Sequence, residues 1–414
     1  FFYVPRTWFM LASRLRCSLH AFLMVQTHME KEMKKNIPNR LFSLPLMLVL
    51  AFALSLAACQ PAAPATPSGA EEPVSEAPAA SNEKITIMEW SGYEVTENPY
   101  LFPAFAEAYT PTIQAAVDYI FFAEDPEAFA KIQSGIHVDL VHPCESYMGL
   151  YVQSGLLQPI DTSRIEHWDD LHPKLVEIGK VDGVQYFVPW DWGYESILVR
   201  TDLVEEVPDA WADLWDPQYA GKIMLWDSGQ ANYAMTALTL GYTDPWGSLS
   251  PAVVAEVKQK LIELKPSVLT YWTDYTQTYD MPASGEAWLT ANAWQDAFGY
   301  LTTEGYETAY IEPAEGRLGW ACGYGILKDA KNLDRVYEFL NAAVAPESAA
   351  GLGNNYWYGH ANTQAVNLIE DYIVEFMKLD QVDALFEHTI FYQPINDEQR
   401  KWVIDMWNEV KAAP

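Results

Sequence analysis

Cysteine is scarce in this chain. The 414 residues hold four cysteines, and no two of them form a C-x-x-C pair. This scarcity excludes a disulfide framework, and the spacing matches no recognised zinc pattern. For Cys144 and Cys322 the sequence leaves three alternatives: one disulfide formed in an oxidising compartment, a metal site shared with His142 and His360, or two small buried thiols.

Positive charge is scarce as well. Lysine and arginine number 25 against 56 aspartates and glutamates, and the formal net charge is −31. Residues 1–58 hold seven of the basic residues and two of the acidic ones, so 18 basic and 54 acidic residues remain for the rest of the chain. Such a field repels nucleic acid and concentrates cations. We therefore expect no nucleic-acid partner. The acidity only hints at a cationic ligand, because it also keeps secreted proteins soluble.

Recognised catalytic motifs are missing. The sequence contains no Gly-x-Ser-x-Gly elbow, no His-Glu-x-x-His and no phosphate-binding loop, each of which would carry a specific chemistry. We therefore predict a non-enzyme without a cofactor or a resident metal. One enzymatic alternative stays open: a glycoside hydrolase needs two acids flanking the scissile bond, and Asp191 and Asp296 could supply them.

The beginning of the chain is typical of an exported protein. Residues 33–58 have the pattern of a signal peptide, because a basic start precedes the apolar run Leu41–Leu56. We place the true start at Met33 or Met29. Residues 1–32 are then sequence translated from upstream of that start.

The end of the apolar run predicts a lipid anchor. The stretch Leu56-Ala57-Ala58-Cys59 resembles the cleavage box of bacterial lipoproteins. That resemblance implies that Cys59 becomes the first residue of the mature chain and carries lipid, which tethers the protein to the cell membrane. An ordinary membrane anchor and cleavage without lipid are the alternatives. Residues 59–83 lack aromatic residues and are rich in Pro, Ala, Ser, Thr and Glu, so they predict a flexible tether.

The body from Lys84 onward, about 330 residues, exceeds a single typical core and predicts two lobes. Strand, helix and strand alternate along it, which predicts a parallel α/β sheet with ligands at the carboxyl ends of the strands. The expected elements are strand Lys84–Met88, helix Tyr100–Tyr109, helix Pro126–Ile132 capped by Asp125, strand Gly135–Val141, strand Lys222–Leu225, a helix from Gly229 to Leu240, helix Pro251–Leu264, strand Gly316–Gly325, helix Leu333–Ala343 capped by Asn332, and helix Asn396–Lys411.

The stretch Val188–Ser196 is the most distinctive in the body. Its proline and glycine predict a turn, from which the β-branched run that follows leaves as a strand. Trp190 and Trp192 flank Asp191 there, and a carboxylate between indole faces could receive an organic cation. The alternative is that both tryptophans lie in the core and that Asp191 caps the turn.

A series of short stretches carries a resemblance to a known family. These are Glu89-Trp90-Ser91-Gly92-Tyr93, Asp139-Leu140-Val141 with Pro143, Gly155-Leu156-Leu157-Gln158, Pro189 with Trp192-Gly193, Trp211-Ala212-Asp213-Leu214-Trp215, Leu240-Gly241-Tyr242, Gly285-Glu286, Glu315-Gly316 with Trp320, and Asp329-Ala330-Lys331-Asn332. In this order and spacing the body resembles the substrate-binding lipoproteins of bacterial ABC importers, nearest the spermidine/putrescine-binding group.

The resemblance implies an architecture and a way of working. The α/β chain is expected to form a two-lobed periplasmic-binding-protein fold of type II, with two chain crossings and the ligand cleft between the lobes. Residues 84–195 and 322–368 would form lobe 1, and residues 196–321 and 369–414 would form lobe 2. The monomeric receptor would close around its ligand and present it to the permease subunits in the membrane.

The resemblance also implies an aromatic-lined cleft. Trp90, Tyr93, Trp294, Trp320 and Tyr358 fall on the family's aromatic positions, and Cys144 and Ser146 fall on a polar pair. The complete set of predicted ligand-binding residues is Trp90, Ser91, Tyr93, Cys144, Ser146, Asp191, Trp192, Ser228, Trp294, Asp296, Trp320, Cys322 and Tyr358.

The acids of the polyamine binders do not carry over. The positions whose carboxylates hold ammonium groups in that family are Ser228, Ala231 and Cys322 here, and a buried cation needs a charged partner. Neighbouring acids could compensate, namely Asp191, Asp296, Asp227 or Glu145. We therefore predict a receptor for a small nitrogenous organic cation, either polyamine-like or a quaternary ammonium. A lipid-anchored secreted glycoside hydrolase and a sensory binding protein that acts without a transporter are the alternatives.

Overall fold

The computed structural model describes residues 84–414, so the predicted signal peptide, Cys59 and the tether lie outside the described residues. Within the described part, no helix is both long enough and apolar enough to cross a membrane. The strands are β1 (Ile85–Trp90), β2 (Val117–Phe122), β3 (Leu140–Val141), β4 (Lys180–Val181), β5 (Val184–Gln185), β6 (Phe187–Arg200), β7 (Ile223–Trp226), β8 (Val268–Trp272), β9 (Leu289–Ala293), β10 (Thr308–Tyr310), β11 (Arg317–Ile326), β12 (Gly359–His360) and β13 (Thr389–Phe391).

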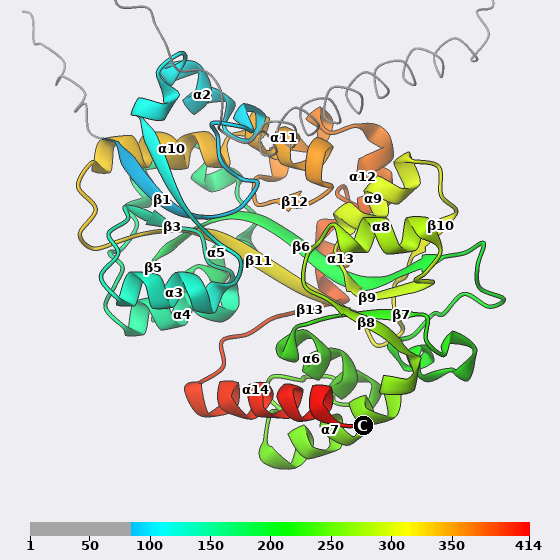
Figure 1. The fold of residues 1–414 in the computed structure, drawn as a ribbon. Helices are drawn as coiled ribbons and strands as arrows, with labels where there is room; N and C mark the ends of the chain where they lie inside the picture. The colour runs from blue at the N-terminus through cyan, green and yellow to red at the C-terminus, as the bar shows by residue number, and fades with distance from the viewer. Residues whose placement is uncertain (1–83) are drawn as a thin grey trace, which may run out of the picture. The chain divides into compact units, whose positions relative to one another are not determined.

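Helices separate most of these strands along the chain (Figure 1). They are α2 (Pro103–Tyr109), α3 (Asp125–Gln133), α4 (Glu145–Gln153), α5 (Pro173–Ile178), α6 (Gly229–Thr239), α7 (Pro251–Leu264), α8 (Gln277–Ser284), α9 (Gln295–Thr303), α10 (Leu333–Val344), α11 (Pro346–Tyr356), α12 (Asp371–Met377), α13 (Val382–Glu387) and α14 (Asp397–Ala412).

Two long strands connect two halves of one sheet. The strand order is β2-β1-β3-β11-β6-β9-β7-β8, with β10 and β12 beside β6 and β13 beside β11. In the first half, β1 is parallel to β2 and β3, and the start of β6 pairs with the end of β11 at Phe187 and Gly325. In the second half, β7 is parallel to β8 and β9, and the end of β6 pairs with β9 from Ser196 to Val199. Strands β6 and β11 therefore both run from one half into the other (Figure 1).

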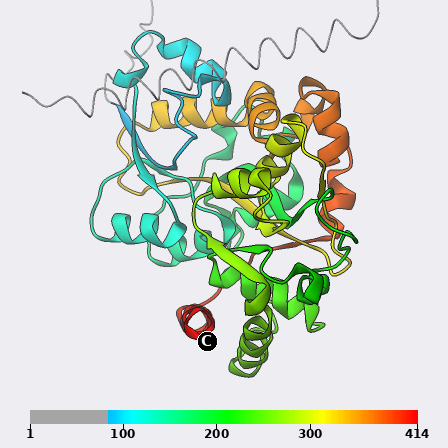
Figure 2. The same cartoon turned by 45° about the vertical axis from the view of Figure 1, so that its right-hand side comes forward.

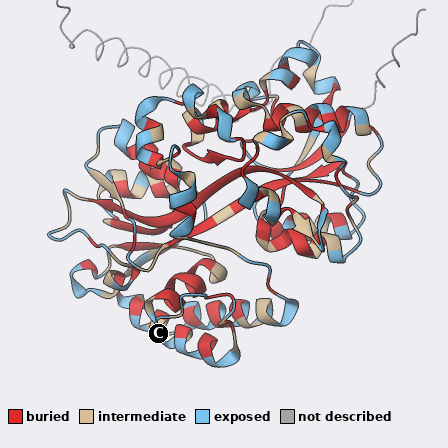
Figure 3. Ribbon diagram, turned by 180° about the vertical axis from the view of Figure 1, so that it is seen from behind, coloured by how far each residue is buried: buried red, intermediate tan, exposed pale blue. Residues whose placement is uncertain are grey.

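Strand β6 replaces the predicted turn at Val188–Ser196, which is a correction. All 14 residues of β6 are buried (Figure 3), because the strand has neighbours along both edges and helices over the sheet. Pro189 lies opposite Gly323 where the register of β6 and β11 is irregular, a place where the missing N–H is tolerated. Gly323 is required there, since an added Cβ would lie 2.5 Å from the Val188 carbonyl oxygen.

One apolar cluster lies mainly in the first half and extends to α9, and another lies in the second half. Helices α2, α10 and α11 cover the first half, where Phe105, Leu340 and Leu352 belong to one buried cluster. Helices α6, α7 and α14 cover the second half (Figure 2), and all three contribute side chains to the second cluster. Two cores joined by two crossing strands agree with the predicted two-lobed α/β fold.

Several predicted helices are confirmed, because their signals are local. Helix α7 spans Pro251–Leu264 as expected, with the Ser250 hydroxyl accepting from the Val253 N–H. The Asn332 side chain caps α10 as predicted. Two details were wrong. Asp125 is the first helical residue of α3, not its cap, and the strand predicted over Gly135–Val141 is only the two residues of β3.

Candidate ligand-binding site

The carboxyl ends of parallel strands from both halves carry most of the predicted site residues. Trp90 ends β1, and Cys144 follows shortly after β3. In the second half, Trp226 ends β7 and Trp294 follows β9 as the cap residue of α9. This is the edge at which open α/β sheets bind ligands. The local order of strand, aromatic residue and helix start therefore puts the candidate residues where a ligand is expected.

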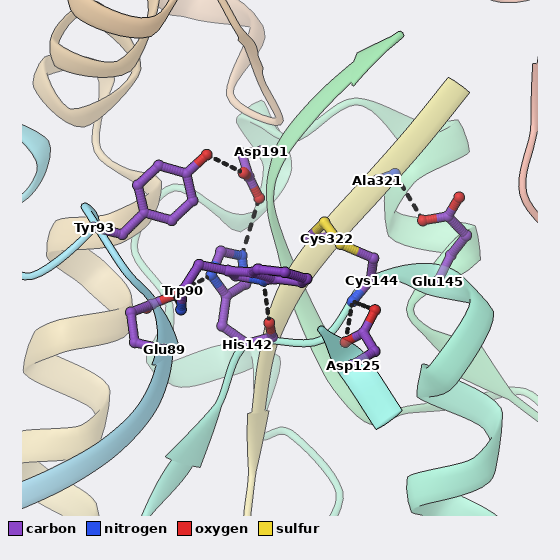
Figure 4. Close-up of a disulfide and its surroundings, with 10 residues drawn as sticks. All are labelled: Glu89, Trp90, Tyr93, Asp125, His142, Cys144, Glu145, Asp191, Ala321 and Cys322. Atoms are coloured by element: carbon purple, nitrogen blue, oxygen red, sulfur yellow. Dashed lines mark hydrogen bonds and ion pairs between the residues drawn. A yellow bond between two sulfur atoms is a disulfide. The ribbon is translucent and has the colours of Figure 1, made fainter. Parts of the chain in front are cut away.

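Cys144 and Cys322 form a disulfide (Figure 4). It joins the cap residue of α4 to β11, and the Cys144 N–H points toward the carboxylate of Asp125. The disulfide decides among the three alternatives for these cysteines. Their contact with a ligand stays a prediction. Within residues 84–414, no group of three or more His, Cys, Asp or Glu side chains could hold a metal ion.

Four aromatic rings meet near the crossing. Trp320 of β11 packs edge-on against Tyr358, with ring centroids 5.0 Å apart. Tyr358 neighbours Tyr356 at 6.0 Å, and Tyr356 packs edge-on against Tyr93 at 5.4 Å. We call Tyr93, Trp320, Tyr356 and Tyr358 the aromatic cluster. Three of its members were predicted, and Tyr356 was missed.

Asp296, in the first turn of α9, brings a carboxylate to this cluster. Tyr279 of α8 donates a hydrogen bond to its Oδ2, while its Oδ1 is buried without a partner. Burial raises the pKa of Asp296, against the opposing effect of the nearby Tyr279 and Tyr358 hydroxyls. The indole N–H of Trp320 is also buried and unpartnered. A buried acceptor or donor without a partner is costly unless a polar group binds it.

Trp90 and Trp294 pack on aromatic partners of their own halves. Trp90 lies 4.4 Å from Phe122 between ring centroids, and its indole N–H donates to the His142 carbonyl oxygen at 2.9 Å. Trp294 packs edge-on against Trp226 at 5.3 Å and Trp272 at 5.5 Å. Both tryptophans are half-buried, so each keeps an accessible surface at the strand ends.

The three predicted serines have different surroundings. Ser91 is exposed just after β1, and Ser146 is half-buried in the first turn of α4. The hydroxyl of Ser228 accepts from the Ala231 N–H at 3.3 Å and caps α6. A capping role accounts for Ser228 without a ligand.

Asp191 does not lie free between two indole rings, which corrects the prediction for it. The side chain is 2% exposed. Its Oδ1 lies 3.0 Å from Nε2 of His142, and its Oδ2 accepts from the Tyr93 hydroxyl at 3.2 Å (Figure 4). Both oxygens are therefore engaged inside the first half. The same contacts remove Asp191 from the acid pair that a glycoside hydrolase would require.

Trp192 is almost completely buried. It is 1% exposed, packs edge-on against Phe386 at 4.8 Å, and donates its indole N–H to the His360 carbonyl oxygen at 3.0 Å. One carboxylate oxygen of Asp227 is also engaged within the protein, because Trp407 and Lys411 both donate to its Oδ1. Of the four acids expected to compensate for the missing carboxylates, Asp296 and Glu145 retain an unpartnered oxygen.

Tyr279, Tyr356 and Trp226 join the site without having been predicted. Tyr279 and Tyr356 reach the acid and the rings from α8 and from the end of α11. No local signal marks them, since tyrosines on helices are common core residues. Trp226 could have been predicted as a site residue, because it directly follows the predicted strand Lys222–Leu225, whose carboxyl end faces the site.

Comparisons with known proteins identify the family. The model of the bacterial extracellular solute-binding protein family matches residues 101–373. The match covers more than half of the sequence, so this chain belongs to that family. Its members are extracellular binding proteins, which agrees with the predicted class and with a non-enzymatic role.

Individual relatives agree with the predicted resemblance. The spermidine/putrescine-binding periplasmic protein of Salmonella typhimurium is 25% identical over 300 residues, which cover 72% of this chain and 82% of the relative. The putrescine/agmatine-binding protein of Pseudomonas aeruginosa is 27% identical over 312 residues, covering 70% and 82%. The structure of the spermidine/putrescine ABC transporter substrate-binding protein PotD from Streptococcus pneumoniae matches with a TM-score of 0.68 at 24% identity, over 80% of this chain and 99% of that one. That likeness confirms the two-lobed fold.

Proposed function

We propose that this chain is the extracytoplasmic receptor of an ABC importer and that it captures a small nitrogenous organic cation. The observation that carries the proposal is the environment of Asp296, a carboxylate with one buried, unpartnered oxygen beside Tyr279, Tyr358 and Trp320. The spermidine/putrescine-binding and putrescine/agmatine-binding relatives support the same ligand class.

A cation would satisfy this environment in two ways. It would pair with Asp296, whose pKa is raised because burial disfavours the charged carboxylate. It would also contact ring faces, an interaction worth about 2 kcal/mol when water is excluded. The unpartnered indole N–H of Trp320 would suit a water or an oxygen atom of the ligand. The ligand is then polyamine-like or a quaternary ammonium.

Capture would occur by closure of the two lobes. Tyr93 and Tyr356 reach the site from the first half, and Asp296 and Tyr279 reach it from the second. The proposed lobes are residues 84–195 with 322–368 and residues 196–321 with 369–414. A hinge motion about the crossing strands would bring these side chains together around the ligand in an aromatic-lined cleft.

The surroundings of the receptor complete the proposal. Lipid on Cys59 would tether the monomer to the cell membrane, and the closed form would dock on permease subunits. ATP would be hydrolysed on other subunits, so this chain would need no cofactor.

Calorimetric titration of the purified protein tests the proposal. The ligands are spermidine, putrescine, agmatine, choline and betaine, with acetate and glucose as non-cationic controls. We expect binding of at least one cation, and a loss of at least about tenfold in affinity in Asp296→Asn, because the charged partner is removed. Asp280→Asn, an exposed acid on neighbouring α8, should bind like the unmodified protein. Binding of only an anion or a sugar would refute the ligand class.

A further inference from the structure

A cavity lies on the face of β6 that is turned away from the aromatic cluster. Trp192 and Gly193 are consecutive residues of β6, so they face opposite sides of the sheet. Trp320 is paired with Gly193, and a Cβ added to Gly193 would collide with the Trp320 ring. Trp320 therefore lies on the Gly193 side, whereas Trp192 lines a cavity on the other side. We call this cavity the rear cavity.

Segments that are distant in sequence form the rear cavity. Ala349 of α11 and Ala365 line it, as do Leu379, which follows α12, and Val382, the first residue of α13. It is therefore bordered by α11 and by the segment that connects α12 to α13 (Figure 1). Its volume is about 570 Å³, and pockets of roughly 300–1,000 Å³ are typical of small-molecule sites. The rear cavity is thus large enough for an organic molecule.

The innermost residues of the rear cavity are apolar. Trp192, Ala349 and Ala365 are each 1% exposed. The indole N–H of Trp192 already donates to the His360 carbonyl oxygen at 3.0 Å, so the ring offers only carbon atoms to an occupant. Aliphatic residues make up most of the remaining lining. Such walls favour an apolar body, because its entry releases water from apolar surface.

Negative charge marks the mouth of the rear cavity. Asp380 and Asp383 line it and are exposed, and none of its lining residues, all within residues 84–414, is a lysine or an arginine. Oδ1 of Asp383 lies 3.2 Å from Nε2 of His172, while Nδ1 of His172 accepts from the Lys174 N–H. A histidine with this pattern carries one proton, on Nε2. Burial also lowers the pKa of His172, so at pH 7 the ring is neutral and leaves the charge of Asp383 uncompensated.

We propose that the rear cavity is a second ligand site and that it takes an amphipathic organic cation, with the apolar body against Trp192 and the ammonium group near Asp380 and Asp383. The shape and the apolar walls account for the body, and the two carboxylates account for the charge. This inference goes beyond the proposed function, because the site uses neither Asp296 nor the aromatic cluster.

Calorimetric titration with three probes that share one apolar body tests the charge of the ligand. The probes are 4-phenylbutylamine, which is cationic, 4-phenylbutan-1-ol, which is uncharged, and 4-phenylbutyrate, which is anionic. At low ionic strength we expect the amine to bind at least about threefold more tightly than the alcohol, a modest factor because exposed carboxylates are screened by water. The butyrate should bind most weakly. The advantage of the amine should disappear in the double variant Asp380→Asn/Asp383→Asn, in which asparagine keeps an oxygen that can accept from His172.

A variant that fills the mouth tests the location of the site. Ala384 is an exposed residue of α13 that lines the rear cavity. Ala384→Trp should weaken binding of both the amine and the alcohol at least about tenfold, because the added ring occupies space that the ligand needs. Ala252→Trp, at an exposed position of α7, and Asp280→Asn, at an exposed position of α8, are the matched controls and should bind both probes like the unmodified protein. Thermal unfolding of each variant at the temperature of the unmodified protein would show that it is folded.

Each contrary result overturns a stated part of the inference. Amine binding that is unchanged in Ala384→Trp would place the amine elsewhere, for example at Asp296, and would overturn the rear cavity as its site. Butyrate binding as tight as that of the amine would overturn the ligand class. If the unmodified protein bound none of the three probes, the second site itself would be refuted. None of these results concerns Asp296→Asn, so the proposed function stands or falls separately.

Discussion

Replacing His142 by glutamine should destabilise the protein by about 3–5 kcal/mol, the usual cost of breaking a buried ion pair. His142 is fully buried between two acids (Figure 4). Its Nδ1 lies 2.6 Å from Oε1 of Glu89, and its Nε2 lies 3.0 Å from Oδ1 of Asp191. Tyr324 and Tyr93 donate to the remaining oxygens of these acids. Glutamine keeps a polar side chain but leaves two buried carboxylates without a positive charge.

The magnitude follows from the ionisation of His142. Burial alone would lower the pKa of His142, but the carboxylates of Glu89 and Asp191 outweigh it and raise the pKa to about 10. Compared with about 6.5 for an unfolded histidine, this shift corresponds to at most about 5 kcal/mol at low pH. Because the folded pKa is the higher one, the stabilisation is fully present below pH 6.5 and is lost as the pH rises through about 10.

Urea unfolding at several pH values between 6 and 10 measures this effect. The difference in unfolding free energy between the unmodified protein and His142→Gln should be largest at pH 6 and shrink toward pH 10. His137→Gln is the control. His137 is exposed, and its Nε2 lies 4.0 Å from Oδ1 of Asp139, which is a long distance for an ion pair. A His142→Gln cost below about 1 kcal/mol, the level of an exposed pair, or a cost that does not change with pH, would refute the buried ion triad.

Three further predictions concern the disulfide and the site. Reducing the Cys144–Cys322 disulfide, which spans 178 residues of sequence, should lower the unfolding free energy by about 5 kcal/mol, and an intact mass that does not change on reduction would show that the bond is not formed. Affinity for an organic cation should rise as the pH is raised from 4 to 8, because burial raises the pKa of Asp296 and a cation favours its ionised form. The titratable groups facing Asp296 are Tyr279 and Tyr358, so an affinity that is flat or falls with pH would contradict the assignment. Gly193→Ala should weaken cation binding at least about fivefold, because its Cβ would lie 2.4 Å from Trp320 and the overpacked indole must move; titration calorimetry would detect unchanged binding if Trp320 had no role.

Local signals were sufficient for much of the fold. The bounds of α7 follow from a serine cap, a proline in the first turn and an apolar stripe, all within 15 residues. The cap of α10 and the position of β11 follow from similarly local patterns. The aromatic residues at strand ends were also predictable, since the carboxyl ends of parallel strands meet at one edge. The family resemblance added the two lobes and the ligand class.

Other features depend on partners that are distant in sequence. Pro189 and Gly193 predicted a turn, but pairing with β11 and β9 overrode these local preferences and made β6 a buried strand. The sequence predicted Asp191 as a ligand-binding acid. In the structure, His142 and Tyr93, which are 49 and 98 residues away in the sequence, engage both of its oxygens. The hydrogen bond of Glu195 is likewise long-range, since Tyr392, whose hydroxyl donates to it, lies 197 residues away.

The sequence by itself thus determined the helices, the strand ends, the acidic character and the family of this protein. The tertiary structure alone decided which acids are satisfied within the protein and which keep a free oxygen. Both groups contain the same residue types in similar local contexts. Whether a carboxylate finds a donor depends on side chains that only long-range packing brings near, and in this chain that difference separates Asp191 from Asp296 and Glu145.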